Sequence, residues 1–130
     1  MEPLTTTVFP WYSVIQDTGA LVAALIRAEP GKKLIAVNEW LSLQEISELL
    51  ARTLGTDIEF VNSKPDFNLG DSDVQRDRKE MMGFCIEYGY DGGKVDKTIV
   101  KPGDLGVPVQ LDSVKEWIKK QDWEKVLLTM

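Results

Sequence analysis

Tyrosine and carboxylate side chains beside aromatic residues are the groups in this sequence that could move a proton. The chain has no histidine, so the side chain that usually titrates near neutral pH is absent. A carboxyl group in an apolar pocket can take over that role, because burial shifts its pKa towards neutrality. Residues of this kind stand at the ends of the expected helices and strands. The catalytic candidates are Tyr12, Glu39, Tyr88 and Asp91.

Several of the aromatic residues could bind a ligand without catalysing a reaction. The candidates for substrate binding are Trp11, Tyr12, Trp40, Phe84, Tyr88 and Tyr90. For the tyrosines and carboxylates that could move a proton, a purely structural role is favoured. Tyr88 and Tyr90 are typical of residues that pack against and cap a helix end, and Glu39 is typical of a solvent-exposed residue at a strand end.

Asp17 lies in a "DTG" triplet, which also marks the catalytic aspartate of aspartic proteases. In this sequence an alanine- and leucine-rich helix follows the triplet, whereas strand-forming residues would follow it in a protease. We therefore expect Asp17 and Thr18 to cap the start of a helix, where their oxygens accept from unpaired backbone N–H groups.

Metal and cofactor sites are not expected. Cys85 is the single cysteine, so neither imidazole nor thiolate pairs are available as ligands. Asp71 and Asp73 could form a weak cation site, but capping of the following helix is favoured. No G-x-S-x-G elbow of a serine hydrolase is present, and no G-x-G-x-x-G motif follows a strand. The nearest glycine clusters are "GYDGG", which follows a helix, and "PGDLG", which lies in a loop, so neither is expected to bind phosphate.

Charge and hydropathy exclude two classes of partner. The formal net charge is −6, and the lysines and arginines are dispersed, which argues against nucleic acid. No apolar run approaches the ~20 residues of a membrane span, and the N-terminus lacks the pattern of a secretory signal. Val74, Met81 and Tyr88 lie at helical spacing around Cys85, so Cys85 is expected to be a small buried hydrophobe. We expect a cytoplasmic protein.

The 130 residues are the right length for one domain, residues 1–130. The pattern predicts a small α/β fold with a short, mostly parallel sheet and about four flanking helices. A helix over 19–28 should bury Leu21, Val22, Leu25 and Ile26, and a buried strand should follow over 33–40.

The second strand–helix unit carries clear end signals. Ser42 and Glu45 predict a capping box, and Gly55 predicts the C-terminal end of that helix. A strand over 57–62 should then pair in parallel with the strand over 33–40.

In the second half, a helix from Asp73 through Tyr90 should place Met81, Cys85 and Tyr88 on one side. Ser113 and Glu116 predict another capping box, followed by a helix that "DWEKVLL" extends or caps. Residues 1–8 are expected to be flexible, and residues 63–72 and 92–110 to be irregular loops.

The order of these segments resembles the C-terminal part of fungal NmrA-like proteins, which are atypical short-chain dehydrogenases/reductases. The resemblance extends from about Phe9 to Leu127. It rests on "PWYSVIQDTG", "ALVAALI", "PGKKLIAVNEWLSLQEISELLARTLG", "EYGYDGG" and "LGVPVQLDSVKEWIKKQDWEKVL".

The Rossmann half of that family is missing from this chain. The resemblance therefore implies no NAD(P) binding and no catalytic residue, and the expected cofactors are none. It implies that the chain begins where such a protein crosses from its cofactor domain to its substrate domain.

Three functions are compatible with this sequence. The favoured one is a stand-alone, redox-cofactor-independent enzyme of fungal secondary metabolism, a cyclase, isomerase or dehydratase acting on a small apolar metabolite. The alternatives are a non-catalytic binding or regulatory module, and a truncated NmrA-like fragment that works with a partner chain.

Loss of a Rossmann half would expose an apolar surface, which soluble monomers rarely do. We therefore expect a homodimer, or a partner chain that covers this surface. A new pocket could form at the dimer seam, lined by Phe9, Trp11, Tyr12 and residues of "MMGFCIEYGY".

Overall fold

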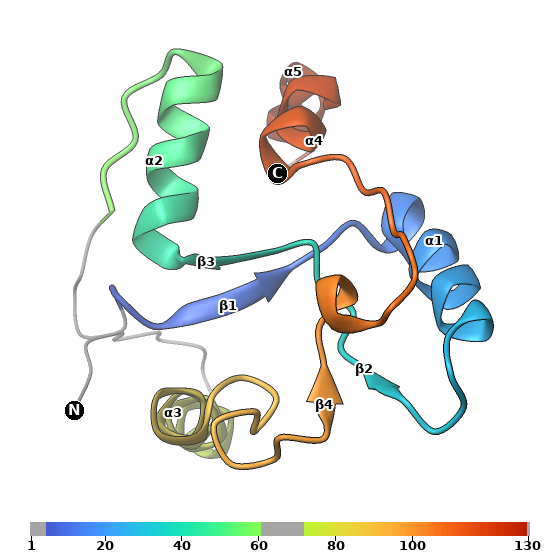
Figure 1. Cartoon of the computed structure of the whole chain (residues 1–130). Helices are drawn as coiled ribbons and strands as arrows, with labels where there is room; N and C mark the ends of the chain where they lie inside the picture. The colour runs from blue at the N-terminus through green and yellow to red at the C-terminus, as the bar shows by residue number, and fades with distance from the viewer. Residues whose placement is uncertain (1–4, 61–71, 130) are drawn as a thin grey trace.

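Two short two-stranded sheets connect the helices of this protein (Figure 1). The computed structural model describes residues 5–60 and 72–129. Along the chain, the elements are β1 (Val8–Trp11), α1 (Val14–Arg27), β2 (Lys33–Leu34), β3 (Glu39–Ser42), α2 (Leu43–Leu54), α3 (Ser72–Tyr88), β4 (Ile99–Val100), a 3₁₀ turn (Pro102–Asp104), α4 (Val114–Lys120) and α5 (Trp123–Leu128). This mixture confirms the α/β class.

The longer sheet is antiparallel. β1 pairs with β3 from Val8 opposite Ser42 to Trp11 opposite Glu39. The predicted strand over 33–40 is thus wrong as one strand, because the backbone leaves β2 after Leu34 and re-enters a different sheet as β3. The prediction of a mostly parallel sheet is wrong for this pair.

The shorter sheet is parallel, and it joins distant parts of the chain. β2 pairs with β4, with Lys33 opposite Ile99 and Leu34 opposite Val100. β4 and the 3₁₀ turn lie inside 92–110, so that region is not wholly irregular. Residues 57–60 form no strand, and residues 61 and 62 lie outside the described residues. The parallel partner of β2 is therefore β4.

Helix α1 begins earlier than the sequence pattern predicts. Its N-cap is Ser13, whose Oγ accepts from the Gln16 N–H at 3.3 Å. Asp17 lies within the first turn, and its Oδ2 accepts from the Ser13 N–H at 2.8 Å. Thr18 donates to the Val14 carbonyl inside the helix. Asp17 and Thr18 are therefore not the N-cap, although Asp17 does bond the cap residue.

Helix α1 buries one side only. Leu21 and Ala24 are buried, whereas Val22 is 50% exposed and Ile26 is 78% exposed. The predicted buried stripe is correct for Leu21 and wrong for Val22, Leu25 and Ile26. An apolar outer face of α1 remains open to solvent.

Both predicted capping boxes are confirmed. Ser42 Oγ accepts from the Glu45 N–H at 3.1 Å, and Glu45 Oε2 accepts from the Ser42 N–H at 2.7 Å. Ser113 and Glu116 form the same pair of bonds at the start of α4. Gly55 ends α2 with φ of 64°, a left-handed conformation that favours glycine. "DWEKVLL" forms a separate helix, α5, whose N-cap is Asp122.

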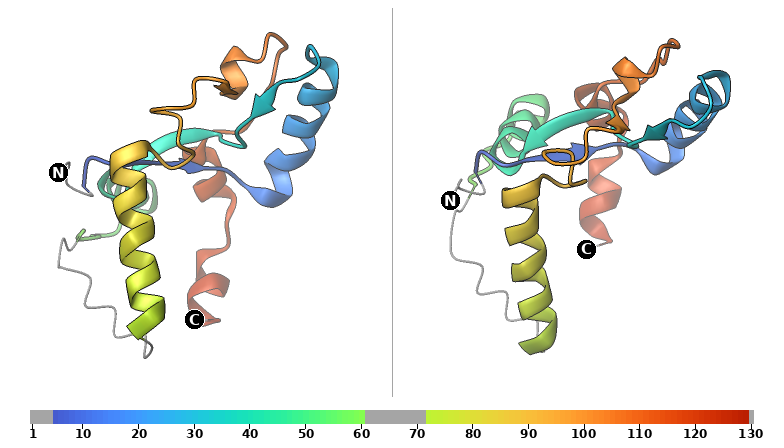
Figure 2. Two further views of the ribbon diagram at one scale, coloured as in Figure 1. Left: turned by 90° about the horizontal axis from the view of Figure 1, so that it is seen from below. Right: turned by 60° about the horizontal axis from the view of Figure 1, so that its bottom comes forward.

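Helix α3 is mostly exposed. Figure 2 shows it running away from the sheets, with its C-terminal end beside them. Cys85 is buried, but Met81 is 51% and Tyr88 is 38% exposed. The side of α3 that carries these three residues is therefore buried only at Cys85.

The buried apolar residues come from both halves of the chain: Leu21, Ala24, Val37, Cys85, Leu105, Val114 and Ile118. Thr7 is also buried, and Val8 pairs with Ser42 at the start of β1. Residues 1–4 lie outside the described residues. Within 5–60 and 72–129, no helix is both long and apolar enough to cross a membrane.

Candidate functional site

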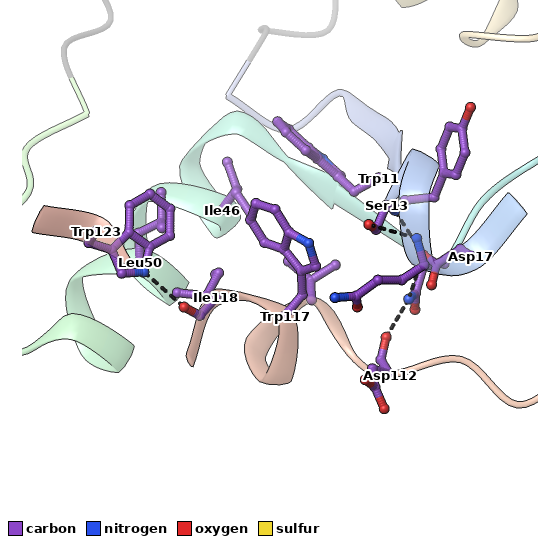
Figure 3. A pocket seen from close by; sticks show the side chains of 13 residues that line it. Trp11, Ser13, Asp17, Ile46, Leu50, Asp112, Trp117, Ile118 and Trp123 are labelled. Atoms are coloured by element: carbon purple, nitrogen blue, oxygen red, sulfur yellow. Dashed lines mark hydrogen bonds between the residues drawn. The ribbon is translucent and has the colours of Figure 1, made fainter. Parts of the chain in front are cut away.

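A pocket of about 280 Å³ opens where β1, the start of α1, α2, α4 and α5 meet (Figure 3). We call it the tryptophan pocket. Its lining residues are Trp11, Tyr12, Ser13, Gln16, Asp17, Asn38, Ile46, Leu50, Asp112, Val114, Trp117, Ile118 and Trp123. Three of the four tryptophans of the chain therefore face one space.

Hydrogen bonds hold two of these indoles in place. Trp11 Nε1 donates to the Leu41 carbonyl of the neighbouring strand at 3.0 Å. Trp123 Nε1 donates to the Ile118 carbonyl at 2.8 Å. The Trp117 and Trp123 rings meet edge to face, with centroids 6.3 Å apart and planes at 85°. Such geometry is favourable for aromatic pairs and fixes the walls of the pocket.

Helices α4 and α2 supply most of the apolar lining, and a capping box fixes where each of them begins. The Ser113–Glu116 box begins α4 immediately before Val114, so that Val114, Trp117 and Ile118 follow on one face. The Ser42–Glu45 box begins α2, which presents Ile46 and Leu50 to the same space. Figure 3 shows Leu50 and Trp123 at one end of the pocket, and Ser13, Asp17 and Asp112 at the other.

The polar end is organised around Asp17, which is only 3% exposed. Its Oδ2 accepts from the Ser13 N–H at 2.8 Å and from Asn38 Nδ2 at 3.2 Å. Asn38 Nδ2 also donates to the Asp112 carbonyl. These bonds join α1, the segment before β3 and the segment before α4 at one wall.

The pocket has an acidic character. Asp17 and Asp112 are its two carboxylates, and no lysine or arginine occurs among these lining residues, all of which belong to the described part of the chain. Asp112 forms an ion pair with Lys120, and this hydrogen bond raises the pKa of Lys120. Asp17 forms no ion pair with any residue of the ranges 5–60 and 72–129.

The sequence candidates divide between two cavities. Trp11 and Tyr12 line the tryptophan pocket. Trp40, Tyr90 and Asp91 line a second cavity of about 450 Å³, together with Cys85, Gly89, Gly93, Ile99 and the lysines 94, 97 and 101. We call it the lysine cavity. The Lys101 ammonium lies 5.4 Å from the centre of the Trp40 ring, a cation–π contact.

Glu39, Phe84 and Tyr88 line neither of these two cavities. Phe84 and Tyr88 pack against each other on the exposed side of α3, with ring centroids 5.0 Å apart. A hydrogen bond to Glu87 raises the pKa of the Tyr88 phenol. The structure therefore does not bring the four catalytic candidates together, and their catalytic roles stay predictions.

Other residues of the tryptophan pocket were not identified as functional from the sequence. Ile46, Leu50, Trp117 and Ile118 lie at the apolar spacing of a helix, which indicates burial but not ligand binding. Asn38 and Asp112 carried no signal of their own. The one signal in the sequence is the presence of three tryptophans within or beside capped elements. This signal does not indicate which tryptophans lie close together in the fold.

Cys85 behaves as a small buried hydrophobe, as expected. It is 4% exposed, and burial raises the pKa of its thiol. In the described part of the chain, no group of three or more metal-ligating side chains occurs. Of the suggested cation pair, Asp71 lies outside the described residues, and Asp73 forms an ion pair with Arg76 at 3.2 Å.

Comparison of the chain with protein-family models, with curated proteins and with solved structures finds no match.

Proposed function

We propose that this protein binds a small, largely apolar molecule in the tryptophan pocket. The observation that carries the proposal is the convergence of three indoles on a space that ends at a buried carboxylate. Ligand sites are typically concave and mostly apolar, with a few polar groups that fix orientation. A volume of about 280 Å³ is near the lower end of such sites, which span roughly 300–1,000 Å³, so the ligand is small.

A resemblance to the substrate half of NmrA-like proteins supports the same proposal. In that interpretation the chain is a cytoplasmic NmrA-like substrate domain, and the pocket holds an apolar metabolite without a redox cofactor. The pocket supports a binding function more directly than it supports any one reaction.

The tryptophans themselves report on occupancy. Titration of the ¹⁵N-labelled protein with 3-phenylpropan-1-ol should shift the indole N–H signals of Trp11, Trp117 and Trp123. Trp40 lies outside this pocket, so its signal should stay in place and serves as an internal control. Uniform shifts of all four signals, or none at millimolar ligand, would contradict the proposal.

A pair of variants on α2 locates the binding site. Leu50→Phe places a larger side chain in the lining and should weaken binding about tenfold or more. Leu54→Phe makes the same change one turn later, where the residue lies outside the lining, and should leave affinity unchanged. Equal effects of the two variants would place the ligand elsewhere.

A catalytic function is the second candidate, favoured by the position of Asp17. Its Oδ1 accepts no hydrogen bond from the described residues, and Tyr12 stands in the same lining. A carboxylate so placed could take a proton from a bound metabolite, as a cofactor-independent isomerase or cyclase requires.

Proton transfer can be tested on whatever ligand copurifies with the protein from its own host. If the protein catalyses proton transfer, incubation in D₂O should place deuterium on a carbon of that ligand, and Asp17→Asn should abolish the exchange. A ligand that binds without exchange would leave a binding or regulatory module.

A further inference from the structure

Asp17 is a buried carboxylate without a cationic partner. The residue is 3% exposed, and its hydrogen-bond donors are a backbone N–H and the Asn38 amide, both neutral. Carboxylates removed from water are normally paired with a cation, because desolvation of an isolated charge is costly. No such partner occurs among residues 5–60 and 72–129.

The hydrogen bonds leave one oxygen for a ligand. Both donors bind Oδ2, so Oδ1 accepts nothing from the described residues. Asp17 lies in the first turn of α1, at the positive end of the helix dipole. The side chain is therefore fixed in orientation while half of it stays available at the pocket wall.

The aromatic walls, like the Asp17 carboxylate, favour positive charge on a ligand. The Nε1 groups of Trp11 and Trp123 already donate to the backbone carbonyls of Leu41 and Ile118, so these indoles offer a ligand mainly their rings. The faces of indole rings attract cations, more strongly where water is excluded. In Figure 3, Trp117 lies between the apolar end and the carboxylates.

An anionic ligand would find no counter-charge. The described lining contains no basic residue, and the nearest ammonium that contacts a lining carboxylate, Lys120, is already paired with Asp112. The lysine-rich surroundings belong to the other cavity.

We infer that the tryptophan pocket selects a small apolar molecule that carries a protonated amine, with the amine on Asp17 and the apolar body against the indoles. This inference rests on the proposed function, since it names the chemical class of the ligand of that same pocket.

Three probes with one apolar body and different head groups test the inference on the unaltered protein. They are 3-phenylpropylamine, 3-phenylpropan-1-ol and 3-phenylpropionate, titrated at pH 7 and followed by the indole N–H signals. The amine should bind about tenfold more tightly than the alcohol, as expected for one charge-assisted hydrogen bond, and the carboxylate more weakly than both.

The outcomes separate this inference from the proposed function. Alcohol and carboxylate binding as tight as amine binding would overturn the amine preference while leaving an apolar pocket. Failure of all three probes to shift Trp11, Trp117 and Trp123 would overturn the proposed function and the inference with it.

Variants identify the group that recognises the amine. Asp17→Asn should remove the preference for the amine over the alcohol, and Asp104→Asn, which makes the same change at an exposed residue outside the lining, should retain it. Gln16→Lys adds a cation at an exposed lining position without touching the Asp17 bonds, and it should reverse the preference towards the carboxylate probe. An unchanged amine preference in a folded Asp17→Asn or in Gln16→Lys would overturn the inference.

Discussion

Asp17 joins three segments of the chain through one carboxylate. It bonds the N-cap residue Ser13 of its own helix and the amide of Asn38, which in turn bonds the carbonyl of Asp112. A local role at the helix start and a long-range role at the pocket wall are thus combined in one side chain. Such a residue is under two constraints, which is why its side chain is held in one orientation.

Cys85 gives a prediction at the scale of a single side chain. Because burial raises the pKa of its thiol, the native protein should react slowly with iodoacetamide at pH 8, and the rate should keep rising to higher pH than for a free thiol. The unfolded thiol loses its proton first, so this group should lower stability as pH rises above about 8.5.

The measurement is the alkylation rate against pH in buffer and in urea. The urea-unfolded chain supplies the reference thiol. A native rate equal to the unfolded rate at pH 8 would show that Cys85 is accessible and would contradict the prediction.

At the scale of elements, the capped helices α2 and α4 form the apolar sides of the pocket. Each starts with a reciprocal pair of hydrogen bonds between residues three positions apart, so their starting points are fixed locally. The strand β1 differs, because its position depends on its pairing with β3, about thirty residues away in the chain.

Removal of the N-cap of α4 tests whether the pocket depends on the capped start of this helix. Ser113→Ala should lower the free energy of unfolding by about 1 kcal/mol, because the Glu116 N–H loses its acceptor. Since α4 carries Trp117, we also expect weaker binding of 3-phenylpropan-1-ol. Urea unfolding and the indole titration measure the two effects.

Ser47→Ala is the matched control, since Ser47 lies inside α2 and its hydroxyl donates to the Leu43 carbonyl within the same helix. Alanine is the better helix former at such a position, so this variant should not lose stability. Equal losses in the two serine variants would contradict the role of the cap.

At the scale of the whole molecule, the outer face of α1 exposes several large apolar residues to solvent. Ile15 is 94% exposed, Ile26 is 78% exposed, and Val22 lies between them at helical spacing. The sequence-based prediction of a homodimer, or of a partner chain, is untested by the structure of one chain and stays a prediction. This face is where we expect the contact.

Light scattering at micromolar concentration tests the prediction of a dimer that forms through the outer face of α1. The protein should behave as a dimer, and Ile26→Lys should shift it towards the monomer. Val95→Lys replaces an apolar residue of similar exposure, 71%, away from α1 and should have no effect. A monodisperse monomer of the unaltered protein would contradict the homodimer and leave a partner chain as the remaining possibility.

The helix starts and ends of this protein could be predicted from the sequence, because they depend on bonds between residues three or four positions apart. Ser42, Gly55 and Ser113 were correctly assigned for this reason. The cap of α1 was misplaced because Ser13 and Asp17 both carry oxygens that can accept at a helix start. In the structure Ser13 is the N-cap, and Asp17 accepts from the Ser13 N–H and from Asn38, which is distant in sequence.

Strand pairing and the pocket could not be predicted in this way. An apolar run such as 33–40 fits either one buried strand or two short ones, and only the partners β4 and β1 decide between these. The pocket needs Trp11, Asn38 and Trp117 in one place, although long stretches of chain separate them. The sequence by itself determined the α/β class, the capped helices and the burial of Cys85. The tertiary structure alone decided which tryptophans meet and that Asp17 faces them, because side chains distant in sequence converge only through packing of the whole chain.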